Sequence, residues 1–133
     1  MRSLTAAAGI GIVLLASGCG GSSSKTSDSP SSAAKPGATV TIPLLTFTPG
    51  DVTIKAGQTV TWVNKNDINH VIVEGSYTVD QSSGLRTEEK SDGAFSLKVA
   101  KKGDTVSYTY PKAGTFTYFC TIHKGMNATV TVQ

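Results

Sequence analysis

The chain has 133 residues, of which 38% are hydrophobic, and 12 Lys and Arg against nine Asp and Glu give a formal net charge of +3. This length suggests one domain and leaves little room for a second. From residue 38 onward nine Lys and Arg face eight Asp and Glu, so the net charge falls to +1. Without a strong field of one sign, nucleic acid is not an expected partner.

The first 18 residues have the pattern of a secretory signal peptide. Met1-Arg2 gives a positive start, an apolar run follows from Leu4 to Ala16, and small residues precede Cys19. The run is too short for a membrane-spanning helix, which needs roughly 20 apolar residues. Cysteine directly after small residues resembles the bacterial lipobox, although leucine is most usual where Ala16 stands. The resemblance implies that Cys19 is acylated; an ordinary signal peptide with a stray cysteine is the alternative.

Residues 20–37 are nearly all Gly, Ser, Ala and Pro, a composition typical of a flexible tether. We therefore expect a lipoprotein signal peptide (1–18), a lipidated cysteine with a flexible linker (19–37) and one folded domain (38–133). Such an anchor would hold an exported domain at a membrane, facing the periplasm or the outside of the cell.

Eight short segments rich in Val, Ile, Thr, Phe and Tyr follow, with turn residues between them. They are residues 39–45, 51–55, 59–64, 70–73, 94–99, 105–110, 115–120 and 128–132. Strands at this spacing predict an all-β sandwich or barrel. The long polar segment 74–93 is expected to cross the surface, with room for a short irregular helix. Alternation in the seventh segment points Cys120 toward the core and Phe119 away from it.

The chemistry is concentrated near the C-terminus, where Cys120, His123 and Met126 have the spacing Cys-x2-His-x2-Met. His70, the other histidine, begins an upstream predicted strand. Two imidazoles, one thiolate and a weak axial thioether are the ligands of a blue-copper site. A strand end followed by a tight loop can turn three side chains onto one metal, while the fourth comes from a neighbouring strand.

Each of these residues also has a simpler interpretation. A Cys-x2-His-x2-Met string can arise by chance, a buried cysteine is often only a small apolar residue, and a lone histidine is more often structural. Their occurrence together after an aromatic strand, in an exported chain, favours the metal site. An iron–sulfur cluster or a structural zinc ion would require more cysteines.

Residues 44–133 resemble the plastocyanin/amicyanin branch of the cupredoxins. The resemblance is carried by residues 47–64 (FTPGDVTIKAGQTVTWVN), by Asn69-His70 and by residues 114–126 (GTFTYFCTIHKGM). It implies an eight-stranded Greek-key β-sandwich that holds one type 1 copper ion per chain. The ligands that it implies are His70, Cys120, His123 and Met126. The two residues between His123 and Met126 match the short amicyanin-type loop.

The resemblance also implies that electrons pass through the solvent-facing edge of His123. Lys124 stands where proline is common and places a positive charge on this electron-transfer surface. Val71 follows His70 where relatives often have Asn or Thr, so we expect a hydrogen bond near the thiolate to be missing, which would affect the reduction potential. Phe119, directed out of the core, is a second candidate for an electron exit.

These features predict an electron carrier and not an enzyme, since no acid–base pair lies beside the site. A copper oxidase or nitrite reductase would need further histidines. The expected partners are proteins (a dehydrogenase, a cytochrome or an oxidase) and the expected state is a monomer. The alternative is a copper chaperone or storage protein of the cell envelope, although such proteins favour open Met- or His-rich sites. A metal-free structural or adhesion domain is disfavoured by the complete ligand set.

Overall fold

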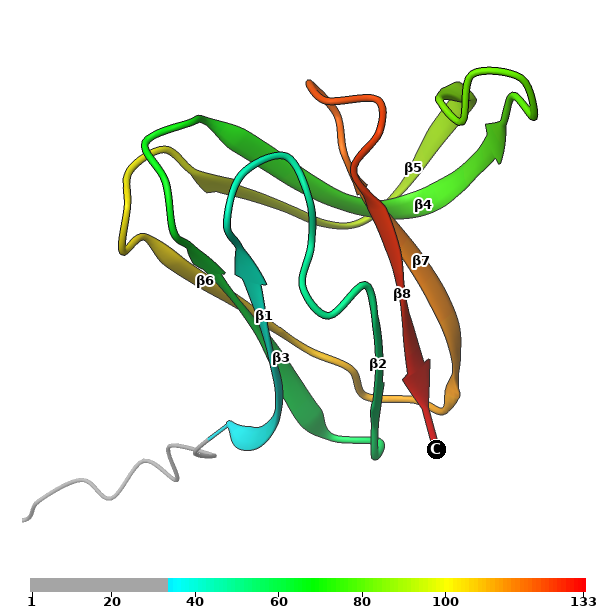
Figure 1. Ribbon diagram of the computed structural model, residues 1–133. Helices are drawn as coiled ribbons and strands as arrows, with labels where there is room; N and C mark the ends of the chain where they lie inside the picture. Colours follow the sequence, from blue (N-terminus) through cyan, green and yellow to red (C-terminus); the bar gives the residue numbers. More distant parts are fainter. Residues whose placement is uncertain (1–33) are drawn as a thin grey trace, which may run out of the picture. The chain divides into compact units, whose positions relative to one another are not determined.

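The structure, a computed structural model, describes residues 34–133. The expected signal peptide, Cys19 and most of the expected linker lie outside the described residues. The described chain forms eight strands in two sheets, with the orders β1-β3-β6 and β2-β8-β7-β4-β5 (Figure 1). The all-β, two-sheet fold predicted from the sequence is therefore confirmed. Residues 34–133 contain no helix that is long and apolar enough to cross a membrane.

The strands follow one another with short connections, except for the longer connection between β1 and β2. Their bounds are β1 (Lys35–Ile42), β2 (Asp51–Ile54), β3 (Gln58–Asn64), β4 (His70–Val79), β5 (Arg86–Val99), β6 (Thr105–Thr109), β7 (Gly114–Cys120) and β8 (Asn127–Val132). Strand β1 begins inside the segment expected to be linker, because its parallel pairing with β3 extends to Lys35 opposite Gln58.

The segment 74–93 departs most from the sequence-based expectation. The expectation of an irregular surface excursion with a short helix is wrong, because β4 and β5 continue as a two-stranded ribbon that pairs Gly75 with Ser91 and Tyr77 with Glu89. In Figure 1 this ribbon curves away from the sandwich toward the end at which the β7–β8 loop lies. We call residues 75–93 the β4–β5 arm.

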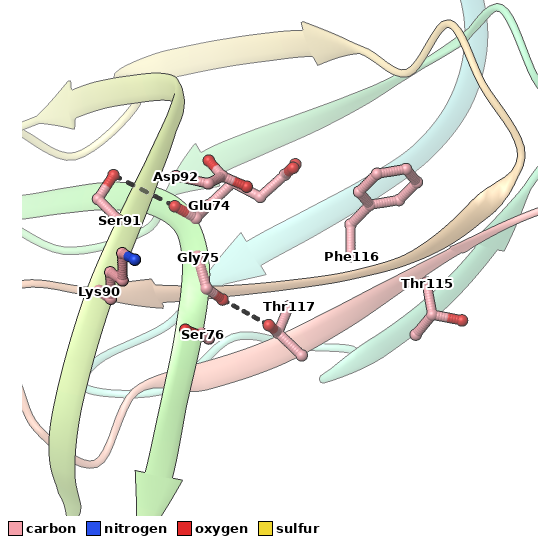
Figure 2. Close-up of a pocket in the computed structure, with 9 residues that line it drawn as sticks. All are labelled: Glu74, Gly75, Ser76, Lys90, Ser91, Asp92, Thr115, Phe116 and Thr117. Atoms are coloured by element: carbon pink, nitrogen blue, oxygen red, sulfur yellow. Dashed lines mark hydrogen bonds between the residues drawn. The ribbon is translucent and has the colours of Figure 1, made fainter.

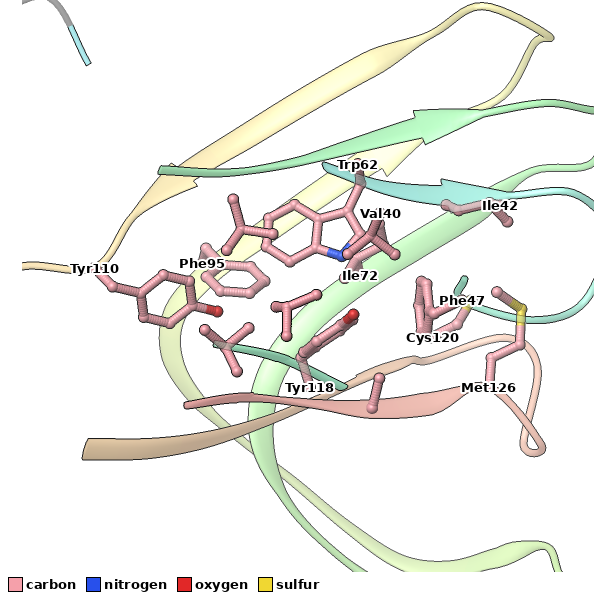
Figure 3. Close-up of a cluster of buried hydrophobic side chains, with 14 of the residues drawn as sticks. Val40, Ile42, Phe47, Trp62, Ile72, Phe95, Tyr110, Tyr118, Cys120 and Met126 are labelled. Carbon is pink, nitrogen blue, oxygen red and sulfur yellow. The ribbon is translucent and has the colours of Figure 1, made fainter. Parts of the chain in front are cut away.

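The core lies between the two sheets and is rich in aromatic rings (Figure 3). Trp62 from β3 is fully buried, with its ring centroid 5.3 Å from that of Tyr118 on β7. The Phe47 ring lies 4.9 Å from Tyr118 on another side. Cys120 and Met126 belong to the same buried cluster. The core is therefore continuous with the end of the sandwich that carries the predicted metal ligands.

A buried acid lies at the base of the β4–β5 arm, beside the pocket shown in Figure 2. The Glu74 side chain is buried, and its main-chain carbonyl accepts a hydrogen bond from the Ser91 hydroxyl at 3.3 Å. Burial, reinforced by the neighbouring Asp92 carboxyl, raises the pKa of Glu74 to about 7. The folded protein thus favours the neutral form of this carboxyl.

This raised pKa predicts that the contribution of Glu74 to stability falls as the pH rises. The unfolded chain releases the Glu74 proton near the ordinary value of 4.5, whereas the folded protein holds it to about 7. Between these values the Glu74 carboxyl holds fewer protons in the unfolded state, so we expect its contribution to the free energy of unfolding to fall by about 2 kcal/mol from pH ~5 to pH ~8. Urea unfolding of the metal-free wild type and of Glu74→Gln measures this contribution as the pH-dependent difference between the two proteins. A difference that does not change with pH would contradict this assignment.

Candidate metal centre

The predicted ligands come from two adjacent strands and one loop. His70 is the first residue of β4 and Cys120 the last residue of β7, and the antiparallel register places Ile72 opposite Cys120. His123 lies in the β7–β8 loop, and Met126 directly precedes β8. The pairing of β4 with β7 therefore brings the upstream histidine to the C-terminal loop.

Three donor groups converge at this end of the sandwich. The side-chain ligand atoms of His70, Cys120 and His123 all lie within 4.8 Å of one another. Cys120 Sγ is 3.4 Å from His123 Nδ1, and the two imidazole centroids are 4.9 Å apart. His70 and Cys120 are fully buried, whereas His123 is half-buried. The site is thus closed on the core side and reaches solvent through one imidazole.

Backbone hydrogen bonds fold the loop back onto the strand end. Cys120 N donates to Met126 O and Met126 N donates to His123 O, each at 3.0 Å, while Thr121 N donates to Val71 O on β4 at 2.9 Å. The Met126 side chain is buried, and Figure 3 shows it at the same end of the core as Cys120. The thioether therefore comes from the same short turn as the thiol and His123.

The unpaired nitrogens of His70 test whether these residues suit a metal ion. Both of its ring nitrogens are buried without a hydrogen-bond partner in the described part of the chain, a costly arrangement. Burial, and secondarily the neighbouring His123, lowers the pKa of His70 and favours the neutral imidazole that ligates metals. Two imidazoles, one thiol and one thioether form a donor set that suits copper in both of its common oxidation states. The residues present fit a copper ion.

The prediction that Phe119 belongs to the electron-transfer surface is wrong. Its side chain does point out of the core, but it is only 2% exposed. The Arg86 guanidinium carbon lies 4.8 Å from the ring centroid, and the Tyr77 ring packs edge-on at 5.9 Å. Both covering residues come from the β4–β5 arm, which closes over this face of β7.

Other residues do remain on the surface at this end. Lys124 is exposed and lies 3.3 Å from Glu89 on the β4–β5 arm. Ile122 is 50% exposed in the ligand loop, and Leu85 is 46% exposed. The Leu85 side chain reaches to within ordinary van der Waals distance of the position that a Cβ on Gly125 would take. The surface beside His123 thus combines apolar side chains with one exposed lysine.

Sequence reasoning missed one residue of this region, Arg86, whose buried guanidinium contacts the ligand loop. The sequence offered one weak signal, because Arg86 is the only arginine beyond Arg2 in a chain whose other cations are lysines. A fork of five donors is preferred over a lysine ammonium where several acceptors must be held at once.

Comparison with known proteins gives one consistent result. Residues 35–133 match the family described as copper binding proteins, plastocyanin/azurin family. Plastocyanin from Scenedesmus fuscus is 42% identical over 91 residues, covering 67% of this chain and 88% of that protein. Amicyanin from Paracoccus versutus is 35% identical over 83 residues, covering 62% of this chain and 54% of that sequence. The chain therefore belongs to the copper-binding plastocyanin/azurin family.

Solved structures agree with this fold. The crystal structure of amicyanin from Paracoccus versutus superimposes with a TM-score of 0.52 at 28% identity, over 80% of this chain and 86% of that one. A purple cupredoxin from Nitrosopumilus maritimus has a TM-score of 0.57 at 24% identity and covers 72% of this chain and 99% of that one, a likeness of fold alone. The predicted resemblance to cupredoxins is confirmed.

Proposed function

We propose that the protein carries single electrons between protein partners through one type 1 copper ion held by His70, Cys120, His123 and Met126. The observation that carries the proposal is the convergence of three donor groups within 4.8 Å at a buried strand end, with both ring nitrogens of His70 unpaired. Copper in this donor set supplies reversible one-electron chemistry. Membership in a copper-binding family supports the same function.

The protein's own residues suit fast exchange of electrons. His70 and Cys120 lie on paired strands, so the distance between them is set by the sheet and not by a mobile loop. Both are fully buried, which excludes water from the donor groups. A rigid, dry site changes little when the charge on the metal changes, and little reorganisation is then needed for electron transfer.

Among the four proposed ligands, His123 is half-buried and the other three are buried, so we assign His123 as the electron exit. Ile122 and Leu85 supply apolar contacts beside it, and Lys124 supplies a positive charge. A redox partner that meets this surface would be a dehydrogenase, a cytochrome or an oxidase with an apolar patch and acidic rim. We expect the protein to be a monomer, which would leave this surface free to bind a redox partner.

Export and anchoring form a second part of the proposal, which rests on the sequence outside the described residues. We assign residues 1–18 as a signal peptide, Cys19 as the acylated residue and residues 20–34 as the tether before β1. The domain would then face the periplasm or the outside of the cell. Release of the protein from membranes by Cys19→Ala would support this assignment, and an unchanged membrane fraction would contradict it.

A titration with Cu(II), followed by visible absorption and electron paramagnetic resonance, tests the copper site. The protein without residues 1–19 should develop an intense red-region thiolate-to-copper band that saturates at one equivalent, with a narrow copper hyperfine splitting. The band should vanish in Cys120→Ser, since the thiolate is its electron donor. A pale spectrum that Cys120→Ser leaves unchanged would overturn the proposal.

A copper chaperone or storage protein is the alternative function, and retention of copper separates it from a carrier. A carrier with this buried site should cycle between its two oxidation states without losing metal. A chaperone should yield Cu(I) readily to a competing ligand.

A further inference from the structure

Arg86, the first residue of β5, grips the ligand loop through main-chain oxygens. Its guanidinium donates to the carbonyl of Cys120 at 2.5 Å, of Met126 at 2.6 Å and of His123 at 3.1 Å. Its main-chain N–H also donates to Lys124 O at 3.2 Å. One side chain thus bonds the main chain of three of the four residues proposed as copper ligands.

One carboxylate and two aromatic rings surround the Arg86 guanidinium. Its side chain is fully buried, and its Nε lies 3.3 Å from Glu89 Oε1, which also lies 3.3 Å from Lys124 Nζ. The guanidinium packs over the Phe119 ring at 4.8 Å and near the Tyr77 ring at 5.8 Å. Burial lowers the pKa of Arg86, and the charge of Glu89 opposes this effect. An arginine stays charged in such surroundings.

Burial of a charge is costly, so this arrangement needs a compensating role. The loop from Thr121 to Gly125 is short, and few of its main-chain groups bond to one another. The hydrogen bond from Met126 N to His123 O and that from Cys120 N to Met126 O close the turn. The carbonyls of Cys120, His123 and Met126 have room for a second donor, and the planar fork of Arg86 meets all three at once.

We propose that Arg86 is a positioning residue that fixes the β7–β8 loop in its ligating conformation before copper binds and retards the loss of copper afterwards. This inference rests on the proposed copper site. It assigns to the β4–β5 arm a specific role, which is to carry the residue that braces the loop from outside the sandwich. The arm also places Leu85 against Gly125, so it covers the same loop with an apolar contact.

Two substitutions separate the effect of the three guanidinium hydrogen bonds from the effect of the positive charge. Arg86→Lys keeps a positive charge but lacks the planar fork, whereas Arg86→Met removes both. We expect both variants to release Cu(I) to a chromogenic chelator faster than the wild type, by about tenfold or more, as for other residues that orient metal ligands. The reduction potential should fall in Arg86→Met, since a nearby positive charge favours the reduced site, and should fall less in Arg86→Lys.

A measurement on the metal-free protein gives an independent readout. Amide hydrogen exchange at Cys120 and Met126, whose N–H groups close the turn, should be faster in both Arg86 variants than in the wild type. Val60→Ala is the control for a general loss of stability, because Val60 is fully buried in β3 of the other sheet. It should lower the free energy of unfolding without changing exchange at these two amides or the rate of copper release.

The outcomes are distinct. Copper release and loop exchange that stay within about twofold of the wild type in Arg86→Lys would overturn the proposal. An equal acceleration in Val60→Ala would also overturn it, since general loss of stability would then explain the effect. If the wild type forms no blue site, the proposed function fails, and exchange in the metal-free variants still decides whether Arg86 holds the loop.

Discussion

Replacing Trp62 by alanine is expected to destabilise the metal-free protein by about 3–5 kcal/mol, as for other buried tryptophans. Trp62 is fully buried on β3, and its ring meets Tyr118 from the other sheet at 5.3 Å and Phe95 at 5.6 Å. The substitution leaves a cavity between the two sheets, and the surrounding rings cannot collapse far because the strands of the five-stranded sheet, β5 and β7, hold them in place. Small domains have only about 5–15 kcal/mol of stability in total, so this loss is large.

Urea unfolding at 25 °C, followed by tyrosine fluorescence and circular dichroism, measures the change. Leu44→Ala serves as the control, because Leu44 is 56% exposed and its truncation should alter stability by no more than about 0.5 kcal/mol. If Trp62→Ala cost as little as Leu44→Ala, the indole would not be the central contact between the sheets.

Replacing Gly75 by alanine is expected to cost about 3 kcal/mol, because a Cβ at this position meets backbone. The added carbon would lie 2.8 Å from Ser91 Cα and closer still to the Lys90 carbonyl oxygen. Gly75 follows a register shift between β4 and β5, and its own carbonyl accepts the Thr117 hydroxyl at 2.5 Å (Figure 2). Main-chain atoms cannot move aside as a flexible side chain can, so the two strands of the arm must separate.

Gly50→Ala is the matched control for this substitution, since a Cβ on Gly50 would meet no atom within 4 Å. Urea unfolding should place Gly50→Ala within about 0.5 kcal/mol of the wild type. Relative to the wild type, amide hydrogen exchange in Gly75→Ala should accelerate most in residues 75–93, where the strands are forced apart. Uniform exchange across both sheets, or equal stability of the two variants, would contradict the close approach seen at Gly75.

The Gly75 substitution also bears on the copper site. The register shift beside Gly75 lets the arm bend toward the β7–β8 loop, and Arg86 lies beyond this point on the arm. A displaced arm should loosen the grip of Arg86 on the carbonyls of the loop. We therefore expect Gly75→Ala to accelerate exchange at the Met126 amide as well, although Gly75 contacts no proposed ligand.

Much of the candidate site could be predicted because its determinants are local. Cys120, His123 and Met126 lie within one strand end and its turn, so their spacing alone places all three at one end of the sandwich. His70 required one step more, namely that its strand pairs with β7, and the register of Ile72 with Cys120 confirms this pairing. Alternation along β7 likewise indicated that Cys120 faces the core, where it is fully buried.

The β4–β5 arm could not be predicted by the same reasoning. Alternation of apolar and polar residues reveals a strand only when one face is buried, and most residues of 80–94 are exposed. From its sequence alone, such a ribbon resembles an irregular polar segment on the surface. The burial of Phe119 could not be predicted from the sequence for a related reason. The residues that bury its ring, Tyr77 and Arg86, lie far from it along the chain.

The sequence by itself determined the class of fold and the set of copper donors, because strand periodicity and ligand spacing act over a few residues. Only the tertiary structure decided how the ligand loop is braced and which rings near it stay exposed. The bonds from Arg86 to the loop join residues 34 to 40 positions apart. They depend on the register and bend of β4 and β5, which long-range pairing sets and which no local pattern records.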